Sequence, residues 1–351
     1  MKKIKVAVLY GGPSAEREVS LVTGRAVLEN LDKKKYQAYS VEMTRDKCFV
    51  LNNNRTKKEI DLQWFKKQAD IVFIALHGSP GEDGGIQGML ESVGVRYTGP
   101  GVLASALAMN KLYASEIFLS NGLPVPVFEH VKREGWKKYK SLVTKELIKN
   151  LGLPLVIKPI NQGSAVGISI VKTQKEFILA MDKTIKDYDW VMVQKFIKGH
   201  EVTCGILEVK GVTIPLPPTL ILPKKSSFYD YASKYASGGS DHVCPAPFPK
   251  QINNKIQEAA LKCHKALGCR GMSRTDIILV PGIEKKAKKK RKIENYAKSM
   301  AVTKPFEAAG FYILETNTIP GMTPTSLLPE AAKVAGYEFG KMLDLIIEAG
   351  R

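Results

Sequence analysis

The sequence predicts a mixed α/β protein with more than one lobe. Its 351 residues exceed the usual size of a single hydrophobic core, and 44% hydrophobic with 25% charged residues is ordinary for a globular enzyme. The N-terminal part alternates strand-like runs, glycine turns and helical patterns, as doubly wound α/β layers do. Later segments favour strands, so we expect α+β lobes there.

The first lobe begins with a strand at residues 4–10, followed by Gly11 and Gly12. Ser14 is a plausible N-cap for the helix that follows. The residues expected on its buried face are Val19, Val22, Ala26 and Leu31. A second buried strand at 71–76 leads directly into His77, and a helix with apolar residues at helical spacing follows it. We expect this lobe to span residues 1–101.

The rest of the chain is expected to form two further lobes, 102–190 and 191–351. A helix should run over 111–121, because Gly122 and Pro124 then end it. The expected strands lie at 155–159, 168–171, 191–197, 201–207, 275–279 and 311–315. A helical tail should follow from about Pro329.

The N-terminal apolar run is too short for a signal peptide, and no apolar stretch has membrane-spanning length. The five cysteines show no CxxC spacing, which fits reduced thiols in a cytoplasmic protein. A metal cluster of Cys263, His264 and Cys269 is the alternative. Buried free thiols are the favoured interpretation.

The net charge of +19 is partly concentrated between Glu284 and Glu307, where nine cations face three acids. Nucleic-acid binding is one interpretation of such a segment. However, no aromatic platform or helix-turn-helix pattern accompanies it. A solvated lysine-rich loop that attracts an anionic substrate such as ATP is favoured.

The residues best suited to chemistry lie near the C-terminus. Side chains two apart share one face of a strand, so Arg274 pairs with Asp276 and Glu315 with Asn317. If the two strands pair antiparallel, two carboxylates and an amide oxygen converge, as Mg²⁺ requires. Arg274 beside them would stabilise a transferring phosphoryl group. A salt-bridged surface hairpin is the alternative.

Other candidate residues lie at strand ends and turns. The loop 161–167 joins two strands, so it either covers phosphates with its N–H groups or is a plain turn, and Lys158 precedes it. Glu16 and His77 follow buried strands, at the usual ligand rim of an α/β sheet. Ser326 begins a helix, where it would bind a carboxylate or simply cap the helix.

Several motifs together resemble the D-alanine–D-alanine ligase family of the ATP-grasp superfamily. Three carry the most information: Gly-Gly-Pro-Ser-Ala-Glu-Arg-Glu-Val-Ser at 11–20, Leu-His-Gly-Ser-Pro-Gly-Glu-Asp-Gly at 76–84, and Glu-Thr-Asn-Thr-Ile-Pro-Gly-Met-Thr at 315–323. Further matching segments are 97–99, 106–111, 158–159, 163–167, 229–231 and 234–235. The resemblance covers the chain nearly end to end, excepting 281–310. It implies a three-lobed ATP-grasp fold that clamps ATP.

The resemblance also implies a reaction and its residues. ATP would phosphorylate one D-alanine, and the amine of a second D-alanine would attack the acyl phosphate, supplying a peptidoglycan precursor. The residues implied to contact ATP are Lys111, Lys158, Gly163, Ser164, Gln194, Lys195, Ile197, Glu201 and Lys234. Those implied to bind the substrates are Glu16, His77, Ser326 and Leu327. Glu16 would be linked to Ser164 and Tyr235, whereas Arg274 and the Gly321 N–H would stabilise the oxyanion.

The implied ligands of two Mg²⁺ or Mn²⁺ ions are Asp276, Glu315 and Asn317. The resemblance further implies a homodimer, while the sequence itself predicts no membrane partner and disfavours nucleic acid. This chain departs from the family pattern at Gln194, where glutamate is common, at Ala165, where a second serine is frequent, and in the basic insertion 281–310. The rival functions are a D-alanine–D-lactate ligase, which Tyr235 disfavours, another ATP-grasp ligase, and a nucleic-acid-binding protein.

Overall fold

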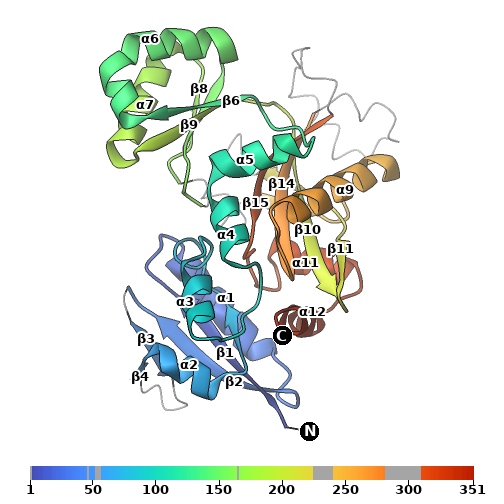
Figure 1. Cartoon of the computed structure of the whole chain (residues 1–351). Coiled ribbons are helices and arrows are strands. Elements are labelled where there is room, and N and C mark those ends of the chain that lie inside the picture. The colour runs from blue at the N-terminus through green and yellow to red at the C-terminus, as the bar shows by residue number, and fades with distance from the viewer. Residues whose placement is uncertain (1, 46, 52–56, 164–165, 224–239, 281–309) are drawn as a thin grey trace.

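The computed structural model describes residues 2–45, 47–51, 57–163, 166–223, 240–280 and 310–351. Their strands form three separate sheets, stacked along the length of the molecule with helices against them (Figure 1). The mixed α/β class expected from the sequence is confirmed.

The first sheet has the strand order β4-β3-β2-β1-β5. Its strands are β1 (Ile4–Gly11), β2 (Tyr36–Met43), β3 (Cys48–Leu51), β4 (Lys57–Ile60) and β5 (Ile71–Ile74). Strands β2 and β5 run parallel to β1 on its two sides, while β3 and β4 continue the sheet antiparallel. The helices of this part are α1 (Arg17–Asn30), α2 (Leu62–Gln68) and α3 (Gly85–Ser92). Because β1 and β5 are parallel neighbours, the loops that follow them meet at one edge.

Two details of α1 differ from the sequence-based expectation. Its N-cap position is Glu16 rather than Ser14, whose hydroxyl donates to the His77 carbonyl oxygen (2.6 Å). Its buried residues are Ser20, Thr23, Gly24 and Val27, whereas Val22 is 52% exposed. The helix therefore packs on the first sheet mainly through small and polar side chains. The spacing of apolar residues does not reveal such a buried face.

The second sheet is antiparallel, with the strand order β6-β9-β7-β8. Its strands are β6 (Phe128–Lys132), β7 (Leu155–Pro159), β8 (Ser169–Val171) and β9 (Trp190–Lys195). Helices α6 (Arg133–Leu151) and α7 (Gln174–Asp187) pack on it around Trp136, Phe177 and Met181. Helices α4 (Val102–Met109) and α5 (Lys111–Ser120) lie between this sheet and the first one (Figure 1).

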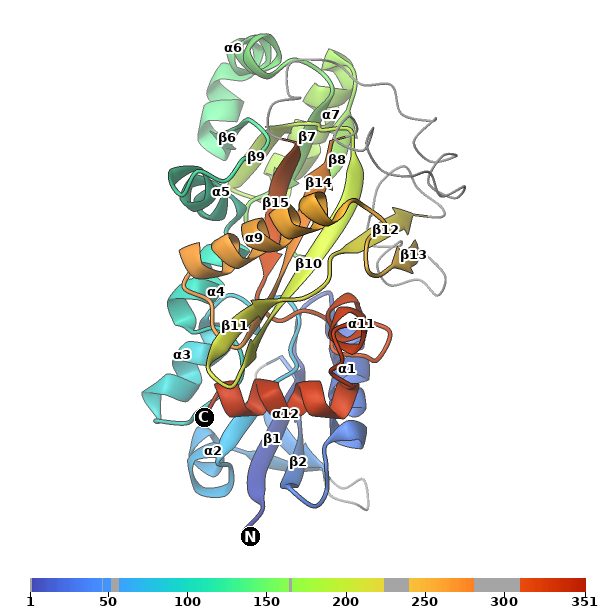
Figure 2. The same cartoon turned by 90° about the vertical axis from the view of Figure 1, so that its right-hand side faces the viewer.

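The third sheet has the order β13-β12-β10-β14-β15, and β11 pairs with β10. Its strands are β10 (His200–Val209), β11 (Val212–Pro215), β12 (Thr219–Pro223), β13 (Ser240–Val243), β14 (Met272–Leu279) and β15 (Phe311–Asn317). Helix α9 (Lys250–Ala266) lies along the sheet (Figure 2), and Ile256, Ala260 and Cys263 pack there in a buried core.

The C-terminal helices α11 (Leu327–Val334) and α12 (Phe339–Ala349) connect the third sheet to the first. Leu328 of α11 packs closely on Gly205, where an added Cβ would lie 2.5 Å from the leucine side chain. Met342, Leu343 and Ile346 of α12 belong to the same core as the strands of the first sheet. The chain end thus holds the lobe of the third sheet against the lobe of the first sheet.

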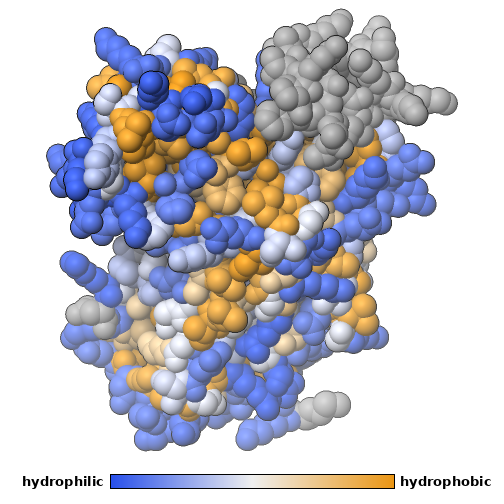
Figure 3. Space-filling model, turned by 45° about the horizontal axis from the view of Figure 1, so that its top comes forward, coloured by the Kyte–Doolittle hydropathy of each residue, from blue (hydrophilic) through white to orange (hydrophobic). Residues whose placement is uncertain are grey.

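Within the described ranges, no single helix is long and apolar enough to span a membrane; only α4 with α5, bent by 102°, meet the length and composition criteria together. On the face shown in Figure 3, hydrophilic side chains surround smaller apolar patches.

Candidate active site

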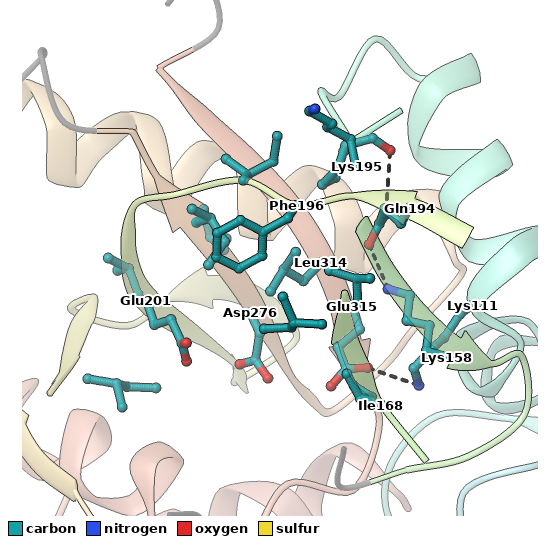
Figure 4. A pocket seen from close by; sticks show the side chains of 18 residues that line it. Lys111, Lys158, Ile168, Gln194, Lys195, Phe196, Glu201, Asp276, Leu314 and Glu315 are labelled. Carbon is teal, nitrogen blue, oxygen red and sulfur yellow. Dashed lines mark hydrogen bonds and ion pairs between the residues drawn. The ribbon is translucent and has the colours of Figure 1, made fainter. Parts of the chain in front are cut away.

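A pocket opens between the second and third sheets, enclosing about 940 Å³ of empty space including its mouth (Figure 4). This size lies within the range of small-molecule sites. Six of the residues expected to bind ATP line it: Lys111, Lys158, Gln194, Lys195, Ile197 and Glu201. Asp276 and Glu315 line the same pocket. The structure therefore brings the expected nucleotide and metal residues together.

The antiparallel pairing of β14 and β15 places the expected metal ligands side by side. Asp276 lies opposite Glu315 and Arg274 opposite Asn317, with a register shift directly after Asp276. The Asn317 amide donates to a carboxylate oxygen of Asp276 at 3.2 Å. The antiparallel pairing that the sequence-based expectation assumed is confirmed, and it brings these oxygen atoms close together.

Both carboxylates have basic neighbours. The Arg274 guanidinium donates to both oxygens of Asp276, at 3.1 and 3.0 Å. The Lys111 ammonium lies 3.0 Å from Glu315 and also donates to the Gln162 carbonyl oxygen at 2.6 Å (Figure 4). Lys111 therefore links the start of α5, the 161–163 loop and β15.

Lys158 lies deeper in the pocket, 5% exposed, and its ammonium donates to the Gln194 side-chain oxygen at 2.8 Å (Figure 4). Burial and the neighbouring Lys111 lower the pKa of Lys158 to about 8, because both disfavour its charged form. The Gln194 side chain accepts this hydrogen bond but is neutral. Unlike a carboxylate, it carries no negative charge that would stabilise the protonated form of Lys158.

Lys195 lines the pocket, but its ammonium donates to the carbonyl oxygens of Gly152 and Leu153, at 3.1 and 3.3 Å. It therefore presents its backbone and aliphatic part to a ligand. The pocket walls are otherwise largely apolar, which the sequence analysis did not anticipate. These wall residues are Val156, Ile168, Ile170, Phe196, Val202, Ile221, Ile277, Ile278 and Leu314. They suit a flat, apolar ring.

Glu16 is 6% exposed and lies between two glycines from distant loops. An added Cβ on Gly78 or on Gly163 would lie 2.9 Å from the same Glu16 oxygen. The carboxylate therefore stands where the first sheet meets the 161–163 loop, and its role at the first substrate stays a prediction.

His77 is 4% exposed, and both of its ring nitrogens contact protein. Nε2 lies 2.9 Å from the Thr23 hydroxyl, and Nδ1 lies 3.1 Å from the Ile319 carbonyl oxygen. Burial lowers the pKa of His77, although Glu16 opposes this. The ring is thus held between α1 and the loop after β15, and its contact with substrate remains a prediction.

Glu82 is a site neighbour that the sequence analysis missed. Its carboxylate accepts from the backbone N–H of Gly78 (2.8 Å) and of Ile319 (3.2 Å). Burial and the nearby Glu16 carboxylate raise the pKa of Glu82. Glu82 belongs to the 76–84 motif, but its hydrogen bond with the distant Ile319 N–H leaves no spacing signal, so its place in the site is seen only in the fold.

Gly321 and Ser326 lie beside each other, because a Cβ on Gly321 would be 3.0 Å from the serine hydroxyl. Ser326 stands at the N-cap position of α11, but its side chain makes no capping hydrogen bond. Its hydroxyl instead accepts from the Thr323 N–H at 3.1 Å. Helix capping therefore does not explain Ser326. Leu327 follows as the first helical residue and is buried.

Some expected features lie outside the described residues: Ser164, Lys234, Tyr235, Ala165 and segment 281–309.

In the part of the chain that the structure describes, no group of three or more His, Cys, Asp or Glu side chains is placed to hold a metal ion. The cluster of Cys263, His264 and Cys269 is therefore excluded. His264 Nδ1 instead pairs with the Ser273 hydroxyl at 2.8 Å.

Comparisons with known families agree with this geometry. The D-ala D-ala ligase N-terminus model matches residues 5–65 and 54–100. The D-ala D-ala ligase C-terminus model matches residues 117–285 and 304–348, and so skips the middle of the basic insertion.

Individual relatives match over nearly their whole length. A D-alanine–D-alanine ligase of Pelotomaculum thermopropionicum is 40% identical over 98% of this chain and 96% of its own. The VanG D-Ala:D-Ser ligase structure from Enterococcus faecalis has 30% identity and a TM-score of 0.81, covering 99% of both chains. The Bacillus anthracis D-alanine–D-alanine ligase complexed with ATP has 29% identity and a TM-score of 0.73, covering 99% of this chain and 97% of that one. These matches cover nearly the whole chain, including the residues of the site described above. They show that the chain belongs to the D-alanine–D-alanine ligase family.

Proposed function

We propose that this chain joins two D-alanines into a dipeptide by activating the carboxylate of the first with ATP. The observation that carries the proposal is the pairing of β14 with β15. It sets Asp276 opposite Glu315 and Arg274 opposite Asn317, and the two carboxylates line a pocket that Lys111 and Lys158 also line.

ATP would lie with its adenine between the apolar walls, against the strand edge at Gln194, Lys195 and Ile197. Glu201 would accept hydrogen bonds from the ribose hydroxyls. The triphosphate would lie near Lys111, Lys158 and Gly163, and we assign Ser164 and Lys234 to the same phosphates. Charge neutralisation by lysines and backbone N–H groups is the usual means of binding phosphate.

The oxygen atoms of Asp276, Glu315 and Asn317 fit magnesium or manganese. Hard oxygen ligands suit these ions, which retain places for water and phosphate oxygens. Arg274 and Lys111 balance the two carboxylates in the structure, and a bound ion would supply the same positive charge. When bound, two such ions would neutralise the charge of the transferring phosphate.

The amino acids would occupy the space next to the phosphates. We assign Glu16, linked to Ser164 and Tyr235, to the ammonium group of the first D-alanine, with His77 beside it. Ser326 and the exposed N–H groups at the start of α11, from Leu327 onward, would bind the carboxylate of the second D-alanine.

The reaction follows from this placement. A carboxylate oxygen of the first D-alanine attacks the γ-phosphorus, and ADP leaves. The second D-alanine loses a proton from its ammonium group to water, and the neutral amine then attacks the acyl carbon. Inorganic phosphate leaves with the oxygen that came from the carboxylate and takes the second proton that the nitrogen loses as the amide forms. Arg274 and the Gly321 N–H would stabilise the tetrahedral oxyanion in between. Positioning and charge account for catalysis, without a covalent enzyme intermediate.

The family resemblance supports four further proposals. Residues 1–101, 102–190 and 191–351 act as the three domains, with the insertion 281–310 in the last. The protein works in the cytoplasm as a homodimer. Its dipeptide feeds peptidoglycan synthesis.

The proposal is tested by phosphate release from ATP in the presence of D-alanine. We expect D-alanine alone to stimulate release, and L-alanine or RNA to have no effect. Mixtures of D-alanine with D-lactate or D-serine distinguish the depsipeptide alternative and the activity named for the Enterococcus faecalis relative. Release that requires D-lactate or D-serine, or an absence of D-alanine-dependent release at millimolar substrate, would contradict the proposal.

A further inference from the structure

The peptide groups of Ile319 are held on both sides by residues of the first lobe. Ile319 is 2% exposed and lies in the loop after β15, two residues beyond Asn317 and two before Gly321. Its N–H donates to Glu82 at 3.2 Å, and its carbonyl oxygen lies 3.1 Å from His77 Nδ1. Both partners come from the loop that follows β5, on a different sheet.

The His77 contact fixes the tautomer of the ring. The Ile319 carbonyl can only accept, so Nδ1 must carry the proton. In the neutral ring Nε2 then accepts from the Thr23 hydroxyl, 2.9 Å away on α1. Thr23 is fully buried, so its hydroxyl has a fixed direction and holds the ring in the state that binds Ile319.

The Glu82 contact uses both carboxylate oxygens. One accepts from Ile319 N–H, and the other accepts from Gly78 N–H at 2.8 Å. Gly78 adopts φ +69°, a conformation that favours glycine, and it adjoins His77. A single carboxylate therefore joins the loop after β5 to the loop after β15.

We propose that Glu82 is a positioning residue for the ligase reaction. Together with His77 it clamps the Ile319 peptide groups and so sets the direction of the Gly321 N–H and the Asn317 side chain. The clamp makes the geometry of the oxyanion and metal groups depend on the first lobe, which also carries Glu16. This inference rests on the roles proposed above for Gly321 and Asn317.

The test is Glu82→Gln. An amide has one accepting oxygen, and its NH₂ group would face a backbone donor, so one of the two hydrogen bonds is lost in either orientation. The matched control is Asp83→Asn in the same loop. The Asp83 carboxylate accepts from the Gly85 N–H (2.9 Å) and from the Ser79 hydroxyl, and both contacts are local to the segment 79–85.

We expect Glu82→Gln to lower kcat about 10- to 100-fold, while KM for ATP changes less than about twofold. Its thermal midpoint should match that of Asp83→Asn within about 2 °C. A merely structural role would lower the midpoint and weaken ATP binding together. Either that pattern or an unchanged kcat would overturn the proposal.

A second variant, Thr23→Val, removes the hydroxyl that fixes the His77 tautomer and should lower kcat in the same way. Because both variants loosen the same peptide groups, the double variant should lose less than the product of the two single effects. Fully multiplicative effects would contradict a shared clamp, and if Glu82→Gln folds poorly, the kcat of Thr23→Val alone tests the clamp, an unchanged kcat contradicting it.

Arg274→Ala separates this inference from the proposed function. If Arg274→Ala abolishes D-alanine-dependent phosphate release but Glu82→Gln does not change kcat, only the clamp is wrong. If Arg274→Ala retains full activity, the proposed site itself is wrong.

Discussion

Asp276 and Glu315 lie directly opposite each other on β14 and β15, and the regular register of the two strands ends immediately after Asp276. Each carboxylate has a cationic partner, Arg274 for Asp276 and Lys111 for Glu315. The two acids therefore lie close together with their negative charges balanced. This arrangement suits a site in which metal ions would take over that balancing charge and phosphate would bind beside them.

Replacing Glu315 with glutamine should remove one negative oxygen from the proposed metal site. We expect kcat to fall about 100-fold or more and the magnesium concentration for half-maximal activity to rise, since a neutral amide binds Mg²⁺ more weakly. Magnesium titrations of the initial rate measure both effects. The control is Glu116→Gln on α5, an exposed residue on the same helix as Lys111. Equal magnesium requirements in the two variants would argue against Glu315 as a ligand.

ATP affinity should decrease as the pH rises through about 8, the value to which burial and Lys111 lower the pKa of Lys158. Below this pH Lys158 is a cation that attracts phosphate, and above it the charge is lost. We expect the Kd for ATP to rise roughly threefold to tenfold between pH 7 and pH 9. Calorimetric titrations over this range provide the measurement.

Gln194→Glu should move that loss of affinity to higher pH by about one unit, because a carboxylate next to Lys158 stabilises the ammonium form. The matched control is Gln37→Glu on β2, an exposed residue of the first sheet. Identical pH profiles for the Gln194 variant and this control would show that Lys158 does not control phosphate affinity.

Gly163→Ala should weaken binding of the first D-alanine. The new methyl group would lie 2.9 Å from the Glu16 oxygen, so the carboxylate must shift from the position assigned to the substrate ammonium. We expect KM for D-alanine to rise about tenfold or more. In contrast, a methyl group on Gly88 would meet only Val102 at 3.8 Å, so Gly88→Ala on α3 should leave KM unchanged. The prediction fails if both variants keep the original KM.

The basic insertion should be dispensable for catalysis. The backbone N–H of Val280 donates to the Gly310 carbonyl oxygen at 3.0 Å, so the two flanks of the segment are already adjacent. Asp276 lies three residues before the end of β14, roughly 10 Å along the strand. Replacing Ile283 to Glu307 with a short glycine turn should therefore keep kcat within about threefold. A folded, ATP-binding variant without ligase activity would refute this prediction.

Much of the site could be predicted because its key residues lie on strands. Because side chains alternate along a strand, Arg274 had to share a face with Asp276, and Glu315 with Asn317. Only the antiparallel pairing of the two strands had to be assumed. The helix beginning near Lys111 was also predictable from its glycine stop. These features depend on local geometry, which sequence spacing records.

Other features depend on tertiary contacts and left no such signal. The predicted α1 face was right at Leu31, which is buried, but wrong at Val22, which is exposed. Ser20 and Thr23 are buried instead, where they contact the Ala75 carbonyl and the His77 ring. Ser14 looked like a helix cap, but its hydroxyl binds the carbonyl of His77, a residue far away in sequence. The role of Glu82 at Ile319 likewise appears only when two loops from different sheets are brought together.

The central claim is that ATP activates a carboxylate of D-alanine. It is tested most directly with D-alanine carrying ¹⁸O in both carboxylate oxygens, followed by mass spectrometry of the released phosphate and of the dipeptide. Our account predicts that each phosphate released by the chain carries one ¹⁸O atom and that D-alanyl-D-alanine forms in equal amount. Unlabelled phosphate, or phosphate released without dipeptide, would contradict it.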